Sequence, residues 1–347
     1  MSTAFLDRVR VEDPFGITAD AALGDMARAL RPEEMEPRLA AALRDGDSGV
    51  RGASLRHIRV VRHKAGRRCL VEYDLEVIRE NGAAEGVTLI GKARAGHRPE
   101  TVFARQQALT AAGFREDSAD GISVPDAVAC FPDLNLWLQR KVPGLPLGSL
   151  LGSNEAGRLA TRVAEAACKV HRCGIPTRRV HTMADEVRIL RERLPAVAQA
   201  QPRWSGRIDR LLAACERLAS GTPEPAPTGI HRDFYHDQVI VSGERLYLID
   251  FDLYCVGDPG VDIGNFLAHV EEQALRDAGD LAAYGGFVRP MLARYLELAG
   301  ADKAAAVDAY ARLTLVRHIH LSSLFPDRRR LTPVLLEICE QRLGAWY

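Results

Sequence analysis

The sequence has no long run of apolar residues. No stretch of its 347 residues approaches the ~18 consecutive apolar residues of a membrane span, and its start, MSTAFLDRVRVEDPFG, places no apolar segment behind basic residues. Neither a membrane-spanning helix nor a signal peptide is therefore expected. Hydrophobic residues still make up 47% of the chain, which is enough for a sizeable core shared between two lobes.

The sequence also has no excess of charge, since 46 Lys and Arg residues balance 46 Asp and Glu residues. Proteins that bind nucleic acid through its phosphates are usually basic, so no nucleic-acid partner is expected. Lysine is scarce and supplies only five of the 46 basic side chains. A lysine inside an apolar segment, such as Lys92 in TLIGKARA, therefore draws attention.

Paired cysteines are not indicated, because the seven cysteines are scattered and odd in number. This pattern is typical of reduced thiols, so a cytoplasmic location is expected. Cys168, His171 and Cys173 lie close together, but a structural zinc site needs four ligands and no second cluster is present. No zinc site is predicted.

Residue patterning predicts an α+β chain in three parts. Residues 1–50 predict an N-terminal helical extension, with helical spacing over 17–46 interrupted at Pro32. Residues 51–143 predict a small β-rich lobe, and residues 144–347 predict a larger, mostly helical lobe. The first lobe has strand patterns over 55–66, 67–78, 86–95, 122–131 and 135–142 and a helix over 99–113; the second has helices over 262–274, 283–299, 303–322 and 333–345.

The segment HRDFYHDQVIVSGERLYLIDFD, residues 231–252, gathers polar side chains around two short apolar runs. The runs flank Gly243 and predict a β-hairpin, which places Gln238 and Asp250 at the same end, with Asp233 in the loop before it. Two carboxylates and an amide oxygen suit Mg²⁺, and a carboxylate that binds no metal can accept a hydroxyl proton. Each residue alone is also explained by turn formation or helix capping.

The spacing His231-x-Asp233-x₄-Gln238, followed by Ile249-Asp250-Phe251 and by GDPGVDIGNF over 257–266, resembles the catalytic segment of the aminoglycoside phosphotransferase and choline kinase family. That family shares the protein-kinase-like two-lobed fold, and the resemblance extends from about residue 56 to the C-terminus. It implies an ATP-dependent phosphotransferase, using ATP or GTP with Mg²⁺ and a small-molecule hydroxyl acceptor.

The resemblance also implies roles for the residues of this segment. Asp233 would be the catalytic base or hydroxyl-orienting acid, and Asp250 would ligate Mg²⁺. His231 would hold the catalytic loop by hydrogen bonds. Asp252 would face either the metal or the substrate. Asp262 would tie the next helix to the loop, although a plain N-cap explains it equally well.

The sequence departs from the family at Gln238, where the family has a metal-binding Asn. Gln offers the same amide oxygen on a longer side chain, while Mg²⁺ demands near-octahedral geometry. A small backbone shift could accommodate this change, Asp250 could carry most of the metal binding, or the site could be damaged. The alternative function is therefore a weak or inactive nucleotide-binding pseudokinase or scaffold.

For the nucleotide, the resemblance implies that Lys92 contacts the α- and β-phosphates. Its expected glutamate partner is Glu100, the nearest acid, although a first-turn Glu favoured by the helix dipole explains that position equally well. Gly66, with Arg67, would lie in the nucleotide-covering loop, where backbone N–H groups approach phosphates. The backbone from Gln139 to Lys141 would face adenine.

The acceptor is left open by the sequence. Aminoglycosides, sugars, amino alcohols, nucleosides and macrolides are all compatible, and no oligomeric state is indicated. The chain passes from Asp250 directly to GDPGVDIG without an activation loop or an A-P-E segment, which favours a small acceptor over a protein. A cationic acceptor would need an acidic pocket, for which the candidates are Asp237, Asp252, Glu271 and Glu272.

Overall fold

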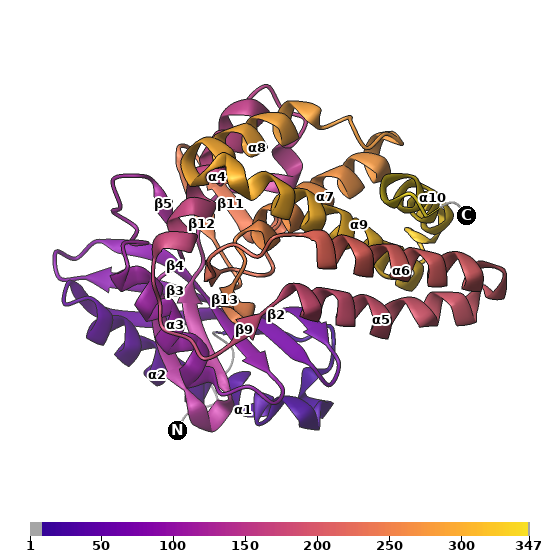
Figure 1. Ribbon diagram of the computed structural model, residues 1–347. Coiled ribbons are helices and arrows are strands. Elements are labelled where there is room, and N and C mark those ends of the chain that lie inside the picture. Colours follow the sequence, from indigo (N-terminus) through magenta and orange to yellow (C-terminus); the bar gives the residue numbers. More distant parts are fainter. Residues whose placement is uncertain (1–8, 346–347) are drawn as a thin grey trace. The chain divides into compact units, whose positions relative to one another are not determined.

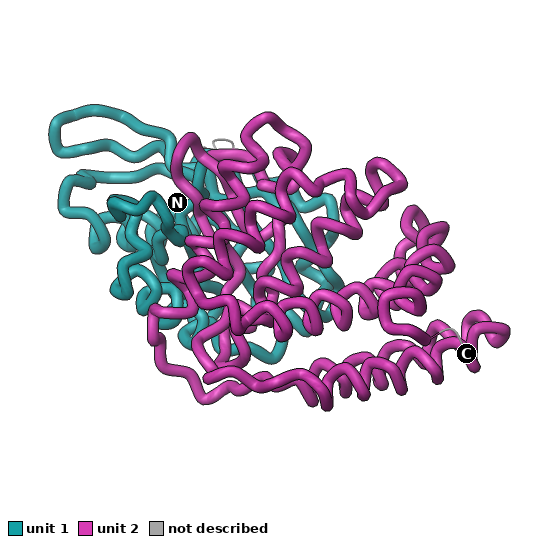
Figure 2. Tube along the Cα trace, turned by 45° about the horizontal axis from the view of Figure 1, so that its top comes forward, with its two compact units in different colours: residues 1–143 teal, residues 144–347 magenta. Residues whose placement is uncertain are grey.

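The computed structural model describes residues 9–345 and divides into two compact units, residues 1–143 and 144–347 (Figure 2). The first unit is rich in strands and the second is mostly helical. The predicted α+β class, with a β-rich N-terminal lobe and a helical C-terminal lobe, is confirmed. The boundary at residue 50 stays a prediction.

The first unit is built on one sheet with the strand order β1-β2-β3-β4-β7-β6 (Figure 1). Strands β2, β3 and β4 form a long antiparallel meander, as their alternating apolar residues predicted. Strand β1 pairs in parallel with β2, and its three residues are too few for periodicity to reveal it. The elements are β1 (Arg10–Glu12), α1 (Met26–Ala29), α2 (Pro32–Gly46), β2 (Val50–Lys64), β3 (Arg68–Arg79), β4 (Ala84–Arg94), α3 (Pro99–Ala111), β5 (Ile122–Ser123), β6 (Ala127–Phe131) and β7 (Leu136–Arg140).

The N-terminal segment is less regular than its helical spacing predicted. Two 3₁₀ turns and the single-turn α1 precede α2, because Gly24 has a φ of +83° and ends the second turn. Pro32 occupies the first turn of α2, where its fixed φ favours helix initiation. Buried Met35 and Leu39 of α2 belong to the same core cluster as Leu55 of β2, so α2 packs on the sheet.

The second unit combines a helical core with two small sheets (Figure 1). Its helical core includes α5, α6, α7, α9 and α10, and the hairpin β11–β12 pairs through β11 with β8. The elements are β8 (Leu145–Pro146), α4 (Ala156–Arg172), β9 (Val180–His181), α5 (Met183–Ala200), α6 (Ser205–Gly221), β10 (Thr228–Ile230), β11 (Val239–Ser242), β12 (Arg245–Leu248), β13 (Cys255–Gly257), α7 (Gly260–Ala278), α8 (Gly285–Ala299), α9 (Ala304–Leu324) and α10 (Thr332–Leu343).

Helices α7 and α9 approach closely at Gly264. A Cβ at this position would lie 2.6 Å from the backbone nitrogen of Ala311 and 2.7 Å from Cβ of Tyr310. Gly264→Ala is therefore expected to lower the free energy of unfolding by about 1–3 kcal/mol, the usual cost of overpacking. Urea unfolding measures this difference.

Gly286→Ala is the matched control for that substitution. Gly286 lies in the first turn of α8, and a Cβ there would have no neighbour within 4 Å. The control is expected to raise the free energy of unfolding by about 0.5 kcal/mol, because alanine reduces the entropy of the unfolded chain. Equal effects of the two substitutions would contradict the close approach of α7 and α9.

Within residues 9–345, no helix has both the length and the apolarity required to cross a membrane.

Candidate active site

The predicted hairpin is present as β11 and β12. Val239 pairs with Leu248 and Ser242 pairs with Arg245, and Gly243 at the turn has a φ of +56°. Beyond the last of these pairs, the Ile249 backbone N–H donates to the Gln238 carbonyl at 3.0 Å. This bond brings Gln238 and the residue after Ile249, Asp250, to the same end of the hairpin.

Asp233 joins the same end of the hairpin through the side chain of Gln238. Nε2 of Gln238 lies 3.5 Å from Oδ2 of Asp233, and Gln238 is 7% exposed. The structure therefore brings together Asp233, Gln238 and Asp250, the three residues whose polar groups the sequence placed at one point.

Two residues in this region adopt left-handed backbone conformations that are uncommon for non-glycine residues. Asp250 has φ 63° and ψ 53°, and Arg232, which precedes Asp233, has φ 69°. Such conformations cost about 1–3 kcal/mol each and persist where the surrounding contacts fix the backbone, often at functional sites. The hydrogen bonds around the loop provide that fixation.

Asp262 holds the loop that carries Asp233. Its Oδ2 accepts from the His231 backbone N–H at 2.8 Å, and its Oδ1 accepts from the Arg232 backbone N–H at 2.7 Å. Nε2 of His171 lies 3.1 Å from Oδ2 of Asp262. Asp262 lies in the first turn of α7 and is 1% exposed, so it ties this helix to the loop. The interpretation of Asp262 as only a helix cap is therefore incomplete.

His231 links the two ends of the segment from inside the protein. Its side chain is fully buried, and Nε2 lies 2.9 Å from the Ile249 carbonyl oxygen. Its ring packs against that of Phe251, with 4.4 Å between the ring centroids. These contacts connect the loop before Asp233 with the residues on both sides of Asp250.

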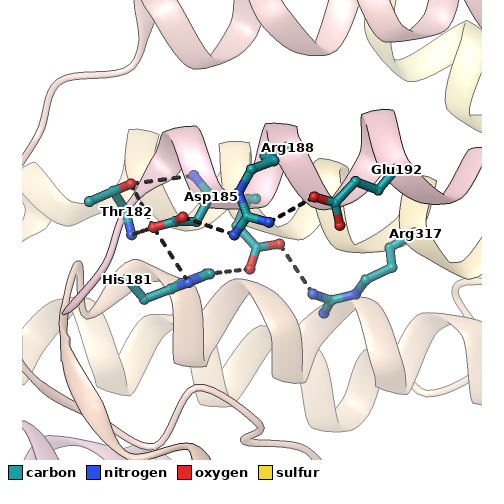
Figure 3. Close-up of polar contacts among 7 residues, drawn as sticks. His181, Thr182, Asp185, Arg188, Glu192 and Arg317 are labelled. Atoms are coloured by element: carbon teal, nitrogen blue, oxygen red, sulfur yellow. Dashed lines mark hydrogen bonds and ion pairs between the residues drawn. The ribbon is translucent and has the colours of Figure 1, made fainter. Parts of the chain in front are cut away.

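A buried polar chain, which the sequence analysis missed, supports the loop from the other side. Nδ2 of Asn265 donates to the Phe234 carbonyl at 2.8 Å, and Nη2 of Arg317 lies 2.5 Å from Oδ1 of Asn265. Nη1 of Arg317 binds Oε2 of Glu186 at 3.1 Å, and Oε1 of Glu186 lies 2.6 Å from Nε2 of His181. Figure 3 labels His181 and Arg317 and marks both of these contacts with dashed lines. Burial opposes ionisation of Glu186, but Arg317 and His181 outweigh it and hold its pKa below the ordinary value.

A capping box begins α5, the helix that carries Glu186 (Figure 3). The Thr182 side chain accepts from the Asp185 backbone N–H at 3.3 Å, and Oδ2 of Asp185 accepts from the Thr182 backbone N–H at 2.9 Å. This backbone hydrogen bond, with the Arg188 and Thr182 side chains, lowers the pKa of Asp185 to about 2. The carboxylate thus stabilises the start of α5 when it is ionised.

Asp185→Asn is expected to cost about 1 kcal/mol of unfolding free energy at pH 6, because it weakens the cap at a partly exposed position. The folded-state pKa is depressed, so this contribution is complete above the ordinary value of 3.8 and is lost as the pH falls toward about 2. The difference in unfolding free energy between Asp185→Asn and the unsubstituted protein should therefore be smaller at pH 3 than at pH 6, as measured by urea unfolding. A difference that grows on acidification would contradict the cap. Glu192→Gln, in a later turn of α5, is the control and should have little effect at pH 6.

Aromatic rings also brace the catalytic loop. Tyr235 stacks on His269 with 4.4 Å between centroids, and His269 meets His318 edge-on at 4.4 Å. Burial lowers the pKa of His318 to about 3 and lowers the pKa of His269 well below its ordinary value. Both imidazoles are therefore neutral at physiological pH and add no positive charge beside the loop.

Lys92 lies in β4 opposite Trp137 of β7, with Nζ 5.0 Å from the centroid of a Trp137 ring. In the part of the chain that the structure describes, Lys92 forms no ion pair with Glu100. Glu100 is exposed in the first turn of α3, which is the position that the helix dipole favours. Farther along α3, Gln106 is buried and donates to the Pro125 carbonyl at 2.6 Å.

The turn at Gly66 is held by contacts within the first unit. The Gly66 N–H donates to Oδ2 of Asp20 at 2.7 Å, and the Arg67 N–H donates to the Lys64 carbonyl at 2.9 Å. His63 also contacts this Asp20 oxygen at 2.7 Å, and the His63 and Gly66 hydrogen bonds hold the pKa of Asp20 below its usual range. Both backbone N–H groups therefore have protein acceptors, because the N-terminal segment folds against the turn.

Gln139 and Lys141 are also engaged within the first unit. Gln139 is 4% exposed within β7. The Lys141 N–H donates to the Thr88 carbonyl at 2.8 Å, and its Nζ binds Oε1 of Glu72 at 2.7 Å. The side chain of Lys141 therefore neutralises a carboxylate of the sheet, whereas the prediction for this segment concerned its backbone.

The donor atoms around Asp250 fit Mg²⁺ held together with a nucleotide. Among residues 9–345, no group of three or more His, Cys, Asp and Glu side chains is arranged as a metal site. Mg²⁺ that accompanies nucleotide phosphates needs only one or two carboxylates, because phosphates and waters complete its octahedron. Asp250 and the amide oxygen of Gln238, at the same end of the hairpin, are oxygen donors of the kind that such an ion takes.

The sequence model of the phosphotransferase enzyme family matches residues 98–298, which is more than half of the chain and includes the catalytic loop, the hairpin and most of α8. The chain belongs to the phosphotransferase enzyme family. The predictions of a phosphotransferase with an alcohol acceptor, and of a relative of aminoglycoside phosphotransferases and choline kinases, are thereby confirmed. Membership does not favour the alternative of an inactive scaffold.

Solved structures show the same fold. A thermostable variant of aminoglycoside phosphotransferase APH(4)-Ia, in a ternary complex with AMP-PNP and hygromycin B, has a TM-score of 0.54 and 15% identity over 89% of this chain and 98% of that one. The GDP and kanamycin complex of another aminoglycoside phosphotransferase has a TM-score of 0.51 and 15% identity over 90% and 100%. An ethanolamine kinase of Plasmodium vivax has a TM-score of 0.52 and 14% identity over 83% of each chain.

At these identities the similarity establishes the kinase-like fold. No curated protein matches the sequence significantly.

Proposed function

We propose that this protein transfers the γ-phosphoryl group of ATP or GTP to a hydroxyl group of a small organic acceptor. The observation that carries the proposal is the convergence of Asp233, Gln238 and Asp250 at one end of the β11–β12 hairpin. The nucleotides in the similar structures, AMP-PNP and GDP, support a nucleotide donor. The family membership supports the reaction class.

Asp233 orients the acceptor hydroxyl and accepts its proton as the oxygen attacks the γ-phosphorus in line. Positioning is the main contribution, because phosphoryl transfer demands little covalent chemistry from the protein. Gln238 contacts one carboxylate oxygen of Asp233 through its amide N–H and so helps to fix the orientation of the carboxylate. His231 and Asp262 act as positioning residues, because their contacts hold the loop backbone.

Asp250 and the amide oxygen of Gln238 would hold Mg²⁺, and Asp252 would serve either the metal or the substrate. The metal supplies charge neutralisation for the nucleotide phosphates when it is bound. The ammonium group of Lys92 is assigned to the α- and β-phosphates. It lies over the Trp137 ring, and within residues 9–345 it forms no ion pair with a carboxylate, so its charge can meet a phosphate. The assignment of Gly66, Arg67, Gln139 and Lys141 to the nucleotide stays a prediction, beside the contacts within the first unit described above.

The acceptor is proposed to be a neutral hydroxyl compound. A polycationic acceptor needs unpaired acids, but Glu271 binds Arg342 at 2.6 Å and Oε2 of Glu272 lies 3.1 Å from Nε of Arg276. Asp237 contacts Nδ1 of its neighbour His236 at 3.0 Å. Asp237, Glu271 and Glu272 are therefore already paired, and sugars and nucleosides become the favoured classes.

The test is Mg²⁺-dependent ADP or GDP release from ATP or GTP over a panel of acceptors. We expect stimulation by one neutral class, such as sugars or nucleosides, and little by kanamycin, hygromycin B or choline. Stimulation by aminoglycosides alone would overturn the acceptor class while leaving phosphoryl transfer intact. Undiminished release by Asp250→Asn would overturn the metal assignment. Gln238→Asn restores the family residue and is expected to retain Mg²⁺-dependent release.

A further inference from the structure

A cavity of about 710 Å³ is lined by residues of the first unit, and none of these residues is assigned above to phosphoryl transfer. It is formed by the C-terminal end of α2, the second half of α3, the loop that follows α3, the start of β6 and the end of β7. This volume falls in the range of small-molecule sites. Ala42, Leu43 and Val128 supply apolar surface, and charged side chains stand among them.

Asp126 and Arg140 are the charged pair that distinguishes this cavity. The Arg140 N–H donates to the Asp126 carbonyl at 2.9 Å, so the two residues are neighbours, and both are half-buried. Within residues 9–345, neither the Asp126 carboxylate nor the Arg140 guanidinium forms a hydrogen bond or an ion pair. Partly desolvated charges of this kind are costly unless they meet a partner.

The other charges around the cavity have partners. Arg115 forms a bidentate pair with Asp117 at 2.9 and 3.0 Å, and Asp47 pairs with Arg79. Burial raises the pKa of Asp126, although the nearby Arg140 opposes that shift. Among the charged residues that line the cavity, Asp126 and Arg140 are thus a carboxylate and a guanidinium whose side chains form no ion pair within residues 9–345.

We propose that this cavity binds a compact zwitterion with an apolar side chain, whose ammonium group meets Asp126 and whose carboxylate meets Arg140. A fork-shaped guanidinium suits a carboxylate, and a carboxylate suits an ammonium group, since each is a charge-assisted hydrogen bond. The apolar part contacts Ala42, Leu43 and Val128. A simple cation or anion would leave one of the two protein charges without a partner, so an α-amino acid fits better than either.

The position of the cavity suggests what its ligand affects. Thr110 and Gln107 of α3 line it, and α3 is tied to the segment before Asp126 by the buried Gln106 side chain. Arg140 ends β7, whose Trp137 lies opposite Lys92 of β4. A bound ligand therefore crosslinks α2, α3 and the strand beside Lys92, and is expected to raise the thermal stability of the full chain.

The test measures binding to the full-length protein by titration calorimetry with three matched probes. Leucine carries both charges, isoamylamine lacks the carboxylate, and 4-methylpentanoate lacks the ammonium group. Leucine, or another apolar α-amino acid in a companion series, should bind saturably, and both single-charge analogues should bind about tenfold or more weakly. Absence of saturable binding by every apolar α-amino acid would overturn the site, and equal binding by either analogue would overturn the zwitterion.

Variants locate the binding. Arg140→Gln and Asp126→Asn should each weaken leucine binding by about tenfold or more, since each removes one charge-assisted contact. Ala111 is an exposed residue of α3 that lines the cavity. Ala111→Trp fills the cavity and should abolish binding, although the charges of Asp126 and Arg140 remain. Arg44→Gln, an exposed arginine of α2 that does not line the cavity, is the control and should leave binding unchanged. Unchanged affinity in all three cavity variants would overturn the assignment.

Discussion

Asp233→Asn is expected to lower the rate of phosphoryl transfer by about 10²–10⁴-fold, the usual contribution of a positioned proton acceptor. The substitution keeps the size of the side chain and the oxygen that meets Gln238, so the loop should keep its conformation. It removes the negative charge that orients the hydroxyl and accepts its proton. Turnover at saturating nucleotide and acceptor measures the loss.

Two comparisons make this expectation specific to Asp233. The dissociation constant for AMP-PNP should stay close to that of the unsubstituted protein, because the residue does not contact the nucleotide in this account. Asp308→Asn, which removes an exposed acid paired with Arg312 on α9, should leave turnover unchanged. Normal turnover in Asp233→Asn would show that another group handles the hydroxyl.

Asp262→Ala is expected to have the second largest effect, on both stability and turnover. The substitution leaves the His231 and Arg232 backbone N–H groups without their acceptors in a site where Asp262 is 1% exposed. The loss should be about 2–4 kcal/mol of unfolding free energy, since each unsatisfied buried donor costs about 1–3 kcal/mol. Urea unfolding measures the loss.

Turnover separates a positioning role for Asp262 from a purely structural one. At temperatures where Asp262→Ala stays folded, turnover should fall with little change in AMP-PNP affinity, because the catalytic loop loses its anchor. Asp262→Asn keeps one acceptor oxygen and should recover part of the activity. Asp280→Ala, which removes one exposed bond to the Ala282 N–H, should change neither property appreciably. Full turnover in folded Asp262→Ala would contradict the positioning role.

The β11–β12 hairpin and its polar end could be predicted because every determinant is local in sequence. Gln238, Gly243 and Asp250 lie within a short segment, and strand pairing converts that spacing into proximity. The longer strands of the first unit, such as β2, β3 and β4, were predictable for a similar reason, since the residue pattern identifies each of them by itself. The class of the protein followed from the ordered motifs over 231–266, which the family comparison confirms.

The residues that fix the catalytic loop could not be predicted in the same way. Glu186, Asn265 and Arg317 come from three helices, and their contacts depend on how those helices pack. The same limit explains the turn at Gly66, where the acceptor Asp20 comes from a segment 46 residues earlier. Short-range patterns specify strands and turns, whereas long-range polar contacts need the tertiary structure.

The central claim is that one end of the β11–β12 hairpin is the centre of phosphoryl transfer to a small molecule. The most direct measurement follows the label from [γ-³²P]ATP and from [γ-³²P]GTP into a panel of neutral hydroxyl compounds, aminoglycosides and amino alcohols, with the unsubstituted protein beside Asp233→Asn. The account predicts a labelled organic phosphate that is formed with Mg²⁺ by the unsubstituted protein and is lost in the variant. Equal labelling by the two proteins, or label released only as inorganic phosphate, would contradict it.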